Sequence, residues 1–203
     1  EYTTKTGEKV SLQSRNVITT VGAYTLKAML PFVKAGDMAP ISALRYAPIV
    51  QVSVGLSNAQ GIEHKAFGGL IPTCEQQQLL GILFPSACFS QRCPAEGALF
   101  SFFLGGMKHG EMLGKTNEEL RELVTKALSK MLGFPQEVKP DMVQIFRHEH
   151  AIPQYELSSG ARFAAVKRIE QAHPGLILGG NLRDGIGMAD RIRQAVAMGL
   201  QIK

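Results

Sequence analysis

The chain has 203 residues and a formal net charge of +5, and 45% of its residues are hydrophobic while 19% are charged. This length and balance are ordinary for a globular protein of one domain or two small ones. No apolar run of about 18 residues occurs, which argues against a membrane-spanning helix. Lys and Arg are too dispersed along the sequence to favour a nucleic-acid partner, whereas an acidic small molecule or an anionic membrane surface suits the modest basic charge.

Cysteine usage bears on the compartment. Cys74, Cys88 and Cys93 are odd in number and contain no Cys-x-x-Cys pair. This pattern predicts neither a disulfide framework nor a structural zinc site, and it is typical of a reducing compartment. We therefore expect a cytoplasmic protein, with at most a peripheral contact to a membrane.

The first predicted elements are short. Two strand patterns are joined by a turn at Ser14 and Arg15, a short helix follows, and a stretch rich in turn-forming residues then reads as a linker. In chain order these elements are strands over 8–13 and 16–21, a helix over 24–30 and the linker over 34–40.

The middle of the chain carries four strand patterns in succession. Val50, Val52, Val54 and Leu56 alternate with other residues, which predicts a strand with one buried face. The connections are polar or contain proline, and short connections between successive strands favour an antiparallel meander. These strands are expected at 49–56, 67–72, 79–84 and 98–106.

The clearest helix pattern covers 116–133. Thr116 and Glu119 have the spacing of a capping box, an apolar stripe follows at helical spacing, and Gly133 ends the pattern. We expect this stripe to pack on the sheet. A strand over 142–150 and a helix over 160–172 come next.

The last pattern is a buried strand over 176–178, a glycine-rich turn, and a helix that begins near Gly187. The predicted fold class is therefore α+β: an antiparallel sheet with packed helices, plus a terminal strand–glycine turn–helix of the kind found in α/β domains.

The glycine-rich turn is the main candidate binding feature. Gly179, Gly180, Gly185 and Gly187 leave the backbone bare, and the following helix offers unpaired N–H groups and the positive end of its dipole. This arrangement suits phosphate or another electron-rich group. The spacing is not Gly-x-Gly-x-x-Gly, so the ordinary dinucleotide motif is absent. A glycine-rich connection without any ligand is the alternative.

Other chemical candidates are weaker. Residues 147–150, "RHEH", offer His148 and His150 on one face of a strand, but two ligands are too few for a metal site, and we expect none. No nucleophile elbow and no pair of catalytic carboxylates stand out, so we expect no catalytic side chain. If the protein is an enzyme, a bound cofactor carries the chemistry.

The end of the chain resembles a known family. The segment 185–192, "GIGMADRI", is similar to the carboxy-terminal flavin-binding motif of protoporphyrinogen oxidases within the flavin amine oxidase group, with Arg191 where that motif usually has Cys. The segment 150–155, "HAIPQY", resembles the part of that family that lines the porphyrinogen pocket. The strand patterns "FGGLIP", "LLGILFPS" and "FFLGG" follow the family's order, and the opening segment resembles its return to the flavin domain.

The resemblance implies a fold and a reaction. It implies FAD as cofactor, a porphyrinogen as substrate in heme biosynthesis, and molecular oxygen as the usual electron acceptor. It assigns flavin contacts to Gly180, Asn181, Gly187, Met188 and Ala189, and pocket walls to Leu70, Phe103 and Ile152.

The family's amino-terminal Gly-x-Gly-x-x-Gly has no counterpart in these residues, so the resemblance implies the carboxy-terminal half of a longer enzyme. It divides the chain into residues 1–33 of the FAD-binding domain, 34–160 of the substrate-binding domain, and 161–203 as the terminal FAD-binding strand and helices. A homodimer is compatible with it. The alternatives are another amine-oxidase-like flavoenzyme, such as a desaturase or amine oxidase, and a non-catalytic domain that binds tetrapyrroles or membranes.

Overall fold

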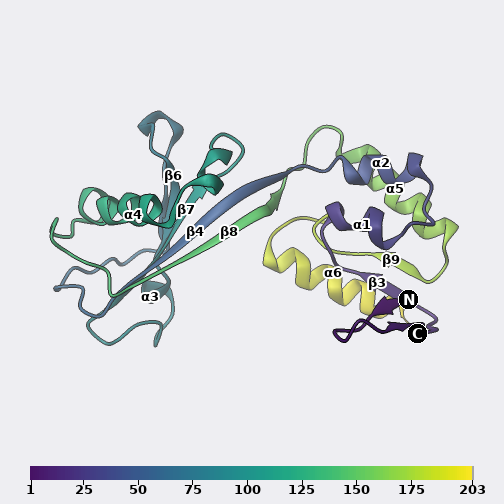
Figure 1. Ribbon diagram of the computed structural model, residues 1–203, viewed down its shortest axis with the longest axis horizontal. Coiled ribbons are helices and arrows are strands. Elements are labelled where there is room, and N and C mark those ends of the chain that lie inside the picture. Colours follow the sequence, from purple (N-terminus) through teal and green to yellow (C-terminus); the bar gives the residue numbers. More distant parts are fainter. Residues whose placement is uncertain (203) are drawn as a thin grey trace. The chain divides into compact units, whose positions relative to one another are not determined.

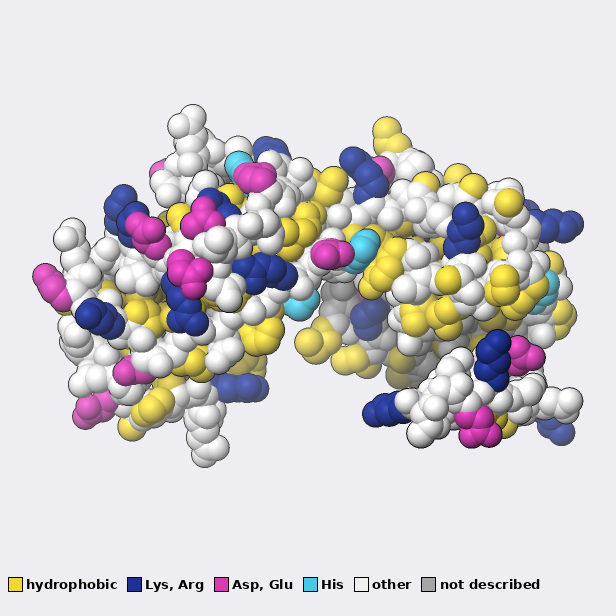
Figure 2. Space-filling view, viewed as in Figure 1, with side chains coloured by type: hydrophobic (Ala, Val, Ile, Leu, Met, Phe, Trp, Pro, Cys, Tyr) yellow, Lys and Arg dark blue, Asp and Glu magenta, His cyan; other side chains and the backbone are white. Residues whose placement is uncertain are grey.

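The computed structural model describes residues 1–202, which form two compact units (Figure 1). The first unit contains residues 1–45 and 153–202, and the second contains Tyr46–Ile152. Lys and Arg side chains are interspersed with Asp and Glu on the face seen in Figure 2, as their dispersion in the sequence predicts.

The described residues of the first unit form two small sheets and four helices. β1 and β2 pair antiparallel, whereas β3 and β9 pair parallel, with Ile18 opposite Ile177. The elements are β1 Tyr2–Thr3, β2 Lys9–Val10, β3 Val17–Thr19, β9 Leu176–Leu178, α1 Ala23–Met29, α2 Ala35–Ser42, α5 Ser159–Ala172 and α6 Met188–Gln201. The expected pairing of the two opening strands with each other is therefore wrong, because each finds a different partner.

Helix α2 replaces the expected linker over 34–40. Its Pro40 removes one amide donor, but Met38 and Ile41 are fully buried and the helix packs against α5. Asp37 on α2 also accepts a hydrogen bond from Arg168 on α5 at 2.7 Å. Burial of the apolar side chains thus outweighs the weak local helix propensity of this segment.

The second unit contains a five-stranded sheet in the order β5–β6–β7–β4–β8. The pairs β5/β6, β6/β7 and β4/β7 are antiparallel. The antiparallel sheet is confirmed, but the simple meander is not, because β4 lies between β7 and β8. The elements are β4 Tyr46–Leu56, β5 Gly68–Leu70, β6 Leu79–Leu83, β7 Ala98–Gly105, β8 Met142–Pro153, α3 Pro85–Cys88, α4 Asn117–Leu132 and the 3₁₀ turns Thr73–Glu75 and Gly110–Gly114.

Helix α4 forms as expected and closes the core of this unit. The Thr116 hydroxyl accepts from the Glu119 N–H at 3.2 Å, the Thr116 N–H donates to the Glu119 carboxylate at 2.8 Å, and Gly133 ends the helix with φ +76°. Its apolar stripe packs in one core cluster with a single face of the sheet. That cluster includes Val50, Val52, Val54, Ile82, Phe100, Phe102, Leu104, Leu120, Val124 and Leu128.

The boundaries of the two units differ from the expected domain limits. The chain passes from one unit to the other after Arg45 and again after Ile152, so residues 34–45 and 153–160 lie with the first unit. The packing of α2 on α5 and the hydrogen bond from the Gln154 N–H to the Arg45 carbonyl, at 2.9 Å, hold both segments there.

Candidate functional site

The glycine-rich loop of residues 179–187 connects β9 to α6 in the first unit. Gly180 has φ +90°, a conformation that L side chains rarely adopt, and a Cβ there would lie 3.0 Å from the Thr20 carbonyl oxygen. Its N–H donates to the Gln194 side-chain oxygen at 2.9 Å. The loop therefore needs glycine at this position for its conformation and for close packing on the segment after β3.

Arg191 on α6 holds this loop by its carbonyl groups. Its guanidinium donates to the carbonyls of Arg183 and Gly185, each at 2.8 Å, and to that of Gly180. It also donates to the Gln194 side-chain oxygen at 2.8 Å. One half-buried side chain thus fixes three peptide groups of the loop.

A second set of donors reaches the loop from α5 and from the segment before it. Arg162, which is buried, donates to the Leu182 carbonyl at 2.8 Å, and its guanidinium lies 4.8 Å from the centre of the Tyr155 ring. The Tyr155 hydroxyl lies 3.0 Å from the Asn181 carbonyl and 3.1 Å from that of Gly185. Partial burial raises the pKa of this phenol, so Tyr155 stays a neutral donor at physiological pH.

Helix α6 begins beside this loop with Gly187 as its N-cap. The Gly187 N–H donates to the Asp190 carboxylate at 3.2 Å, and Gly187, Met188 and Ala189 are all exposed. Within the described residues the N–H groups of Met188 and Ala189 have no hydrogen-bond partner, as is usual in a first helical turn. A Cβ at Gly187 would meet only the Asp190 carboxylate, at 3.3 Å, so this surface is open to the edge of a flat, electron-rich ring.

The five expected flavin contacts therefore fall into two groups, one bonded to the protein and one exposed. Gly180 directs both its N–H and its carbonyl toward protein groups, and the Asn181 carbonyl faces Tyr155. Gly187, Met188 and Ala189 instead present an exposed helix start. Gly187 has φ −70°, a conformation that any residue can adopt, so only its small size distinguishes it.

An exposed apolar stripe runs along the whole length of α6, and the sequence analysis did not identify it. Met188, Ile192, Val196 and Leu200 follow each other at intervals of four residues, and each is at least 60% exposed. A stripe of this kind is typical of a surface that another part of a protein covers. The i, i+4 spacing is visible in the sequence, but the spacing alone does not show whether the stripe is buried or exposed.

In the second unit, Leu70 and Phe103 occupy the sheet face that looks away from α4. The strand register places Leu70 opposite Gly81, and Gly81 opposite Phe103, so all three share one face. A Cβ at Gly81 would lie 3.2 Å from Leu70 Cδ2, which shows that the Leu70 side chain leans over this glycine. Leu70 is 89% exposed and Phe103 is half-buried, so Leu70, Gly81 and Phe103 form an open apolar surface and are not part of the core.

Ile152 lies at the far end of β8 and is exposed. Met142 on the same strand contacts the position of a Cβ on Gly55, which places it on the face of Phe103. Of the three expected pocket residues, Leu70 and Phe103 thus share one face of the sheet, and Ile152 lies near the end of the edge strand β8.

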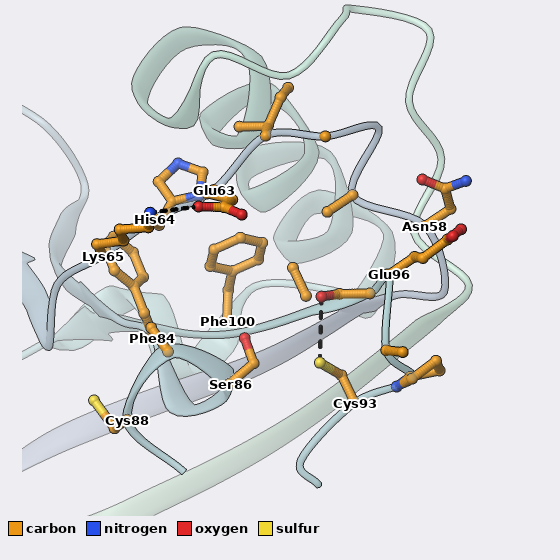
Figure 3. A pocket seen from close by; sticks show the side chains of 18 of the residues that line it. Asn58, Glu63, His64, Lys65, Phe84, Ser86, Cys88, Cys93, Glu96 and Phe100 are labelled. Atoms are coloured by element: carbon orange, nitrogen blue, oxygen red, sulfur yellow. Dashed lines mark hydrogen bonds and ion pairs between the residues drawn. The ribbon is translucent and has the colours of Figure 1, made fainter. Parts of the chain in front are cut away.

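The second unit also contains a depression of 1260 Å³ that the sequence did not indicate. Figure 3 shows its floor, where the His64 ring lies among Phe84 and Phe100, with ring centres 5.2 Å and 5.5 Å away. The Cys93 thiol, 3.3 Å from the Gly97 carbonyl, lies on its wall. No expected site residue lines it. Among residues 1–202 no group of three His, Cys, Asp or Glu side chains is placed to hold a metal ion.

Comparison with known proteins assigns the class. The sequence model of the flavin-containing amine oxidoreductase family matches residues 1–184, and the chain belongs to that family. Within it, the chain is similar to protoporphyrinogen oxidases. It is 29% identical to the chloroplastic enzyme of Nicotiana tabacum over 95% of the chain and 37% of that protein. It is also 26% identical to the Homo sapiens enzyme, over 90% of the chain and 39% of that protein.

Solved structures agree on the fold. A protein from Exiguobacterium sp. 255-15, assigned by name to the protoporphyrinogen oxidases, matches with a TM-score of 0.75 and 18% identity over 92% of this chain and 40% of its own. Cyclohexylamine oxidase from Brevibacterium oxydans matches with a TM-score of 0.67 and 16% identity over 96% of this chain and 45% of its own. The chain spans less than half the length of each of these proteins.

The comparisons correct the expected location. The plant relatives from Nicotiana, Oryza and Arabidopsis are named as chloroplastic or mitochondrial proteins, which contradicts the cytoplasmic location expected from the cysteine pattern. Free thiols are compatible with other reducing compartments, so that pattern could not distinguish among them. Within residues 1–202, no helix is both long and apolar enough to cross a bilayer.

Proposed function

We propose that this chain forms the carboxy-terminal part of an FAD-dependent oxidase that converts a porphyrinogen to a porphyrin, with molecular oxygen as electron acceptor. The observation that carries this proposal is the similarity to named protoporphyrinogen oxidases over 95% of the chain, across both units. In such an oxidase the bound cofactor supplies the chemistry, so the proposal requires no catalytic dyad from this chain.

The flavin would bind at the start of α6. Gly187, Met188 and Ala189 offer exposed backbone at the positive end of the helix dipole, which favours the electron-rich pyrimidine edge of the isoalloxazine ring. Gly180 and Asn181 would contribute by fixing the conformation of the loop, since the Gly180 N–H and the Asn181 carbonyl already form hydrogen bonds within the protein. The adenine half of FAD would need protein outside these residues.

The substrate would lie on the sheet face of Leu70 and Phe103, with Ile152 as a further contact. Gly81 lies between Leu70 and Phe103 and has no side chain, so the surface between them is flat. Apolar side chains bind a flat macrocycle through the apolar area that they bury. The protein's part is then to orient the substrate and to keep water away, and the bound flavin supplies the oxidation.

The test uses the full-length protein that contains this chain. We expect it to purify with one FAD, identified by release and chromatography, and to produce porphyrin fluorescence and consume oxygen when given protoporphyrinogen or coproporphyrinogen. The isolated 203-residue chain should be colourless, because half of a cofactor site offers too little contact. Flavin with turnover of amines and not of porphyrinogens would support the amine oxidase alternative, and absence of flavin would refute the proposal.

A further inference from the structure

Arg191 differs from Arg183 and Arg193, its neighbours at the glycine-rich loop, because it has no acidic partner among the described residues. Glu170 binds Arg183 through two hydrogen bonds of 2.8 and 3.0 Å, and Asp190 binds Arg193 at 3.0 Å. Arg191 donates only to neutral oxygens, and no carboxylate of residues 1–202 lies within ion-pair distance of it.

The remaining acidic group of the loop does not change this balance. The Asp184 carboxylate accepts from the Gln194 amide at 2.8 Å and lies 3.6 Å from the Arg183 guanidinium. It is therefore directed to other partners. The Nε of Arg191 is buried and has no hydrogen-bond partner among the described residues. The guanidinium is thus a half-buried positive charge whose hydrogen-bond partners are all neutral oxygens.

The position of this charge relates it to the start of α6. Arg191 lies one helical turn after Gly187, and its N–H donates to the Gly187 carbonyl at 3.1 Å. Its side chain turns back to the loop carbonyls of Gly180 and Gly185, the second of which lies two residues before the N-cap Gly187. The full charge of the guanidinium therefore adds to the partial positive charge of the helix end.

We infer that Arg191 is a positioning residue for the flavin, which holds the loop by its carbonyls and raises the reduction potential of the bound flavin. This inference rests on the proposed function. Two-electron reduction places negative charge on the pyrimidine part of the ring. A fixed positive charge behind the loop favours that reduced form over the neutral oxidised form. The fork geometry orients the loop, and the charge sets the potential.

Substitutions separate the two roles. In the full-length flavoprotein, Arg191→Lys keeps the charge but cannot bridge three carbonyls, so FAD should bind more weakly while the potential of the bound flavin stays near that of the parent. Arg191→Gln removes the charge and should make the potential more negative by roughly 30 mV or more, a tenfold change for a two-electron couple. Arg191→Cys, the residue typical of the resembled motif, is a second neutral variant in case the glutamine variant fails to fold.

The control is Lys167→Gln, an exposed residue of α5 that makes the same change in net charge. It should leave flavin content and potential unchanged. The measurements are flavin content, melting temperature and the midpoint potential by dye-coupled titration. A potential equal to that of the parent in a flavin-loaded neutral variant overturns this inference alone, and so does a lysine variant with a potential as low as the neutral ones. A parent without flavin overturns both this inference and the proposed function.

Discussion

A methyl group on Gly180 would lie 3.0 Å from the carbonyl oxygen of Thr20, because the segments that follow the parallel strands β9 and β3 pass directly beside each other. Together with its φ of +90°, this contact makes Gly180 the most constrained of the expected cofactor residues. The constraint is structural, so its removal should be seen first in stability.

Gly180→Ala should lower the free energy of unfolding by about 1–3 kcal/mol, since alanine strains this backbone and crowds Thr20. Chemical denaturation of the full-length protein measures the change. Gly36→Ala is the control, because Gly36 lies in α2 with nothing within 4 Å of its Cβ position. There the substitution should be neutral or stabilise by up to about 1 kcal/mol. Equal effects at both positions would contradict the account of Gly180.

Gly187→Val tests the helix start as the flavin surface. The backbone of Gly187 is ordinary, with φ −70°, so the flavin-free variant should fold with a melting temperature close to that of the flavin-free parent. Its branched side chain should nevertheless stand between the backbone and the ring, and flavin content should fall. Absorbance at the flavin band, relative to protein, is the measurement. A fully yellow variant would show that no flavin approaches Gly187.

Leu128→Ala tests the packing of α4 on the sheet. Leu128 is fully buried in the core cluster, and its truncation should cost about 2–5 kcal/mol of stability. Glu118→Ala on the exposed side of the same helix should stay within about 0.5 kcal/mol of the parent. Thermal or urea unfolding compares the two, and similar small shifts would mean that the helix does not close the core.

Adjacent phenylalanines of β7 separate substrate contact from core packing. Phe102 is fully buried on the α4 side, whereas Phe103 is half-buried on the side of Leu70. Phe103→Ala and Leu70→Ala should raise KM for the porphyrinogen, equivalent to about 1–3 kcal/mol, with flavin content preserved. Phe102→Ala should lower stability instead. Rates are expressed per mole of bound flavin. If KM is unchanged in both Phe103→Ala and Leu70→Ala, these residues do not contact substrate.

The carboxylate of Asp141 links the stability of the second unit to pH. The Ser57 N–H and hydroxyl donate to it at 2.6 and 2.8 Å, and these bonds hold the pKa of Asp141 below its usual value. A carboxyl with a lowered folded-state pKa adds stability above its unfolded-state pKa and loses that contribution as pH falls through the folded-state value.

We therefore expect the parent to exceed Asp141→Asn in stability at neutral pH, with the difference closing below about pH 4, the usual range of an aspartate. Melting temperatures across this range measure it. Ser57→Ala should reduce the same difference, since it removes one of the two donors. A gap that is constant from neutral to acidic pH would show that the charge of Asp141 plays no part.

Local patterns in the sequence determined the elements whose stability is itself local. The helix α4 follows from the reciprocal bonds of Thr116 and Glu119 and from an apolar period, all within a few residues of each other. The strand–glycine turn–helix at residues 176–201 is readable for the same reason. The shared family residues then pointed to a flavin protein, and the comparisons confirm the family.

Tertiary structure alone decided the features that depend on partners far away in the chain. Helix α2 exists because Met38 and Ile41 are buried near α5, although its sequence is typical of a linker. The parallel pairing of β3 with β9 and the insertion of β4 between β7 and β8 join segments that no local pattern relates. The hydrogen bonds from Arg191 to three loop carbonyls likewise depend on the direction of one side chain. Such contacts form only when burial and hydrogen bonding across the whole unit are satisfied together, and a sequence pattern read locally does not contain that information.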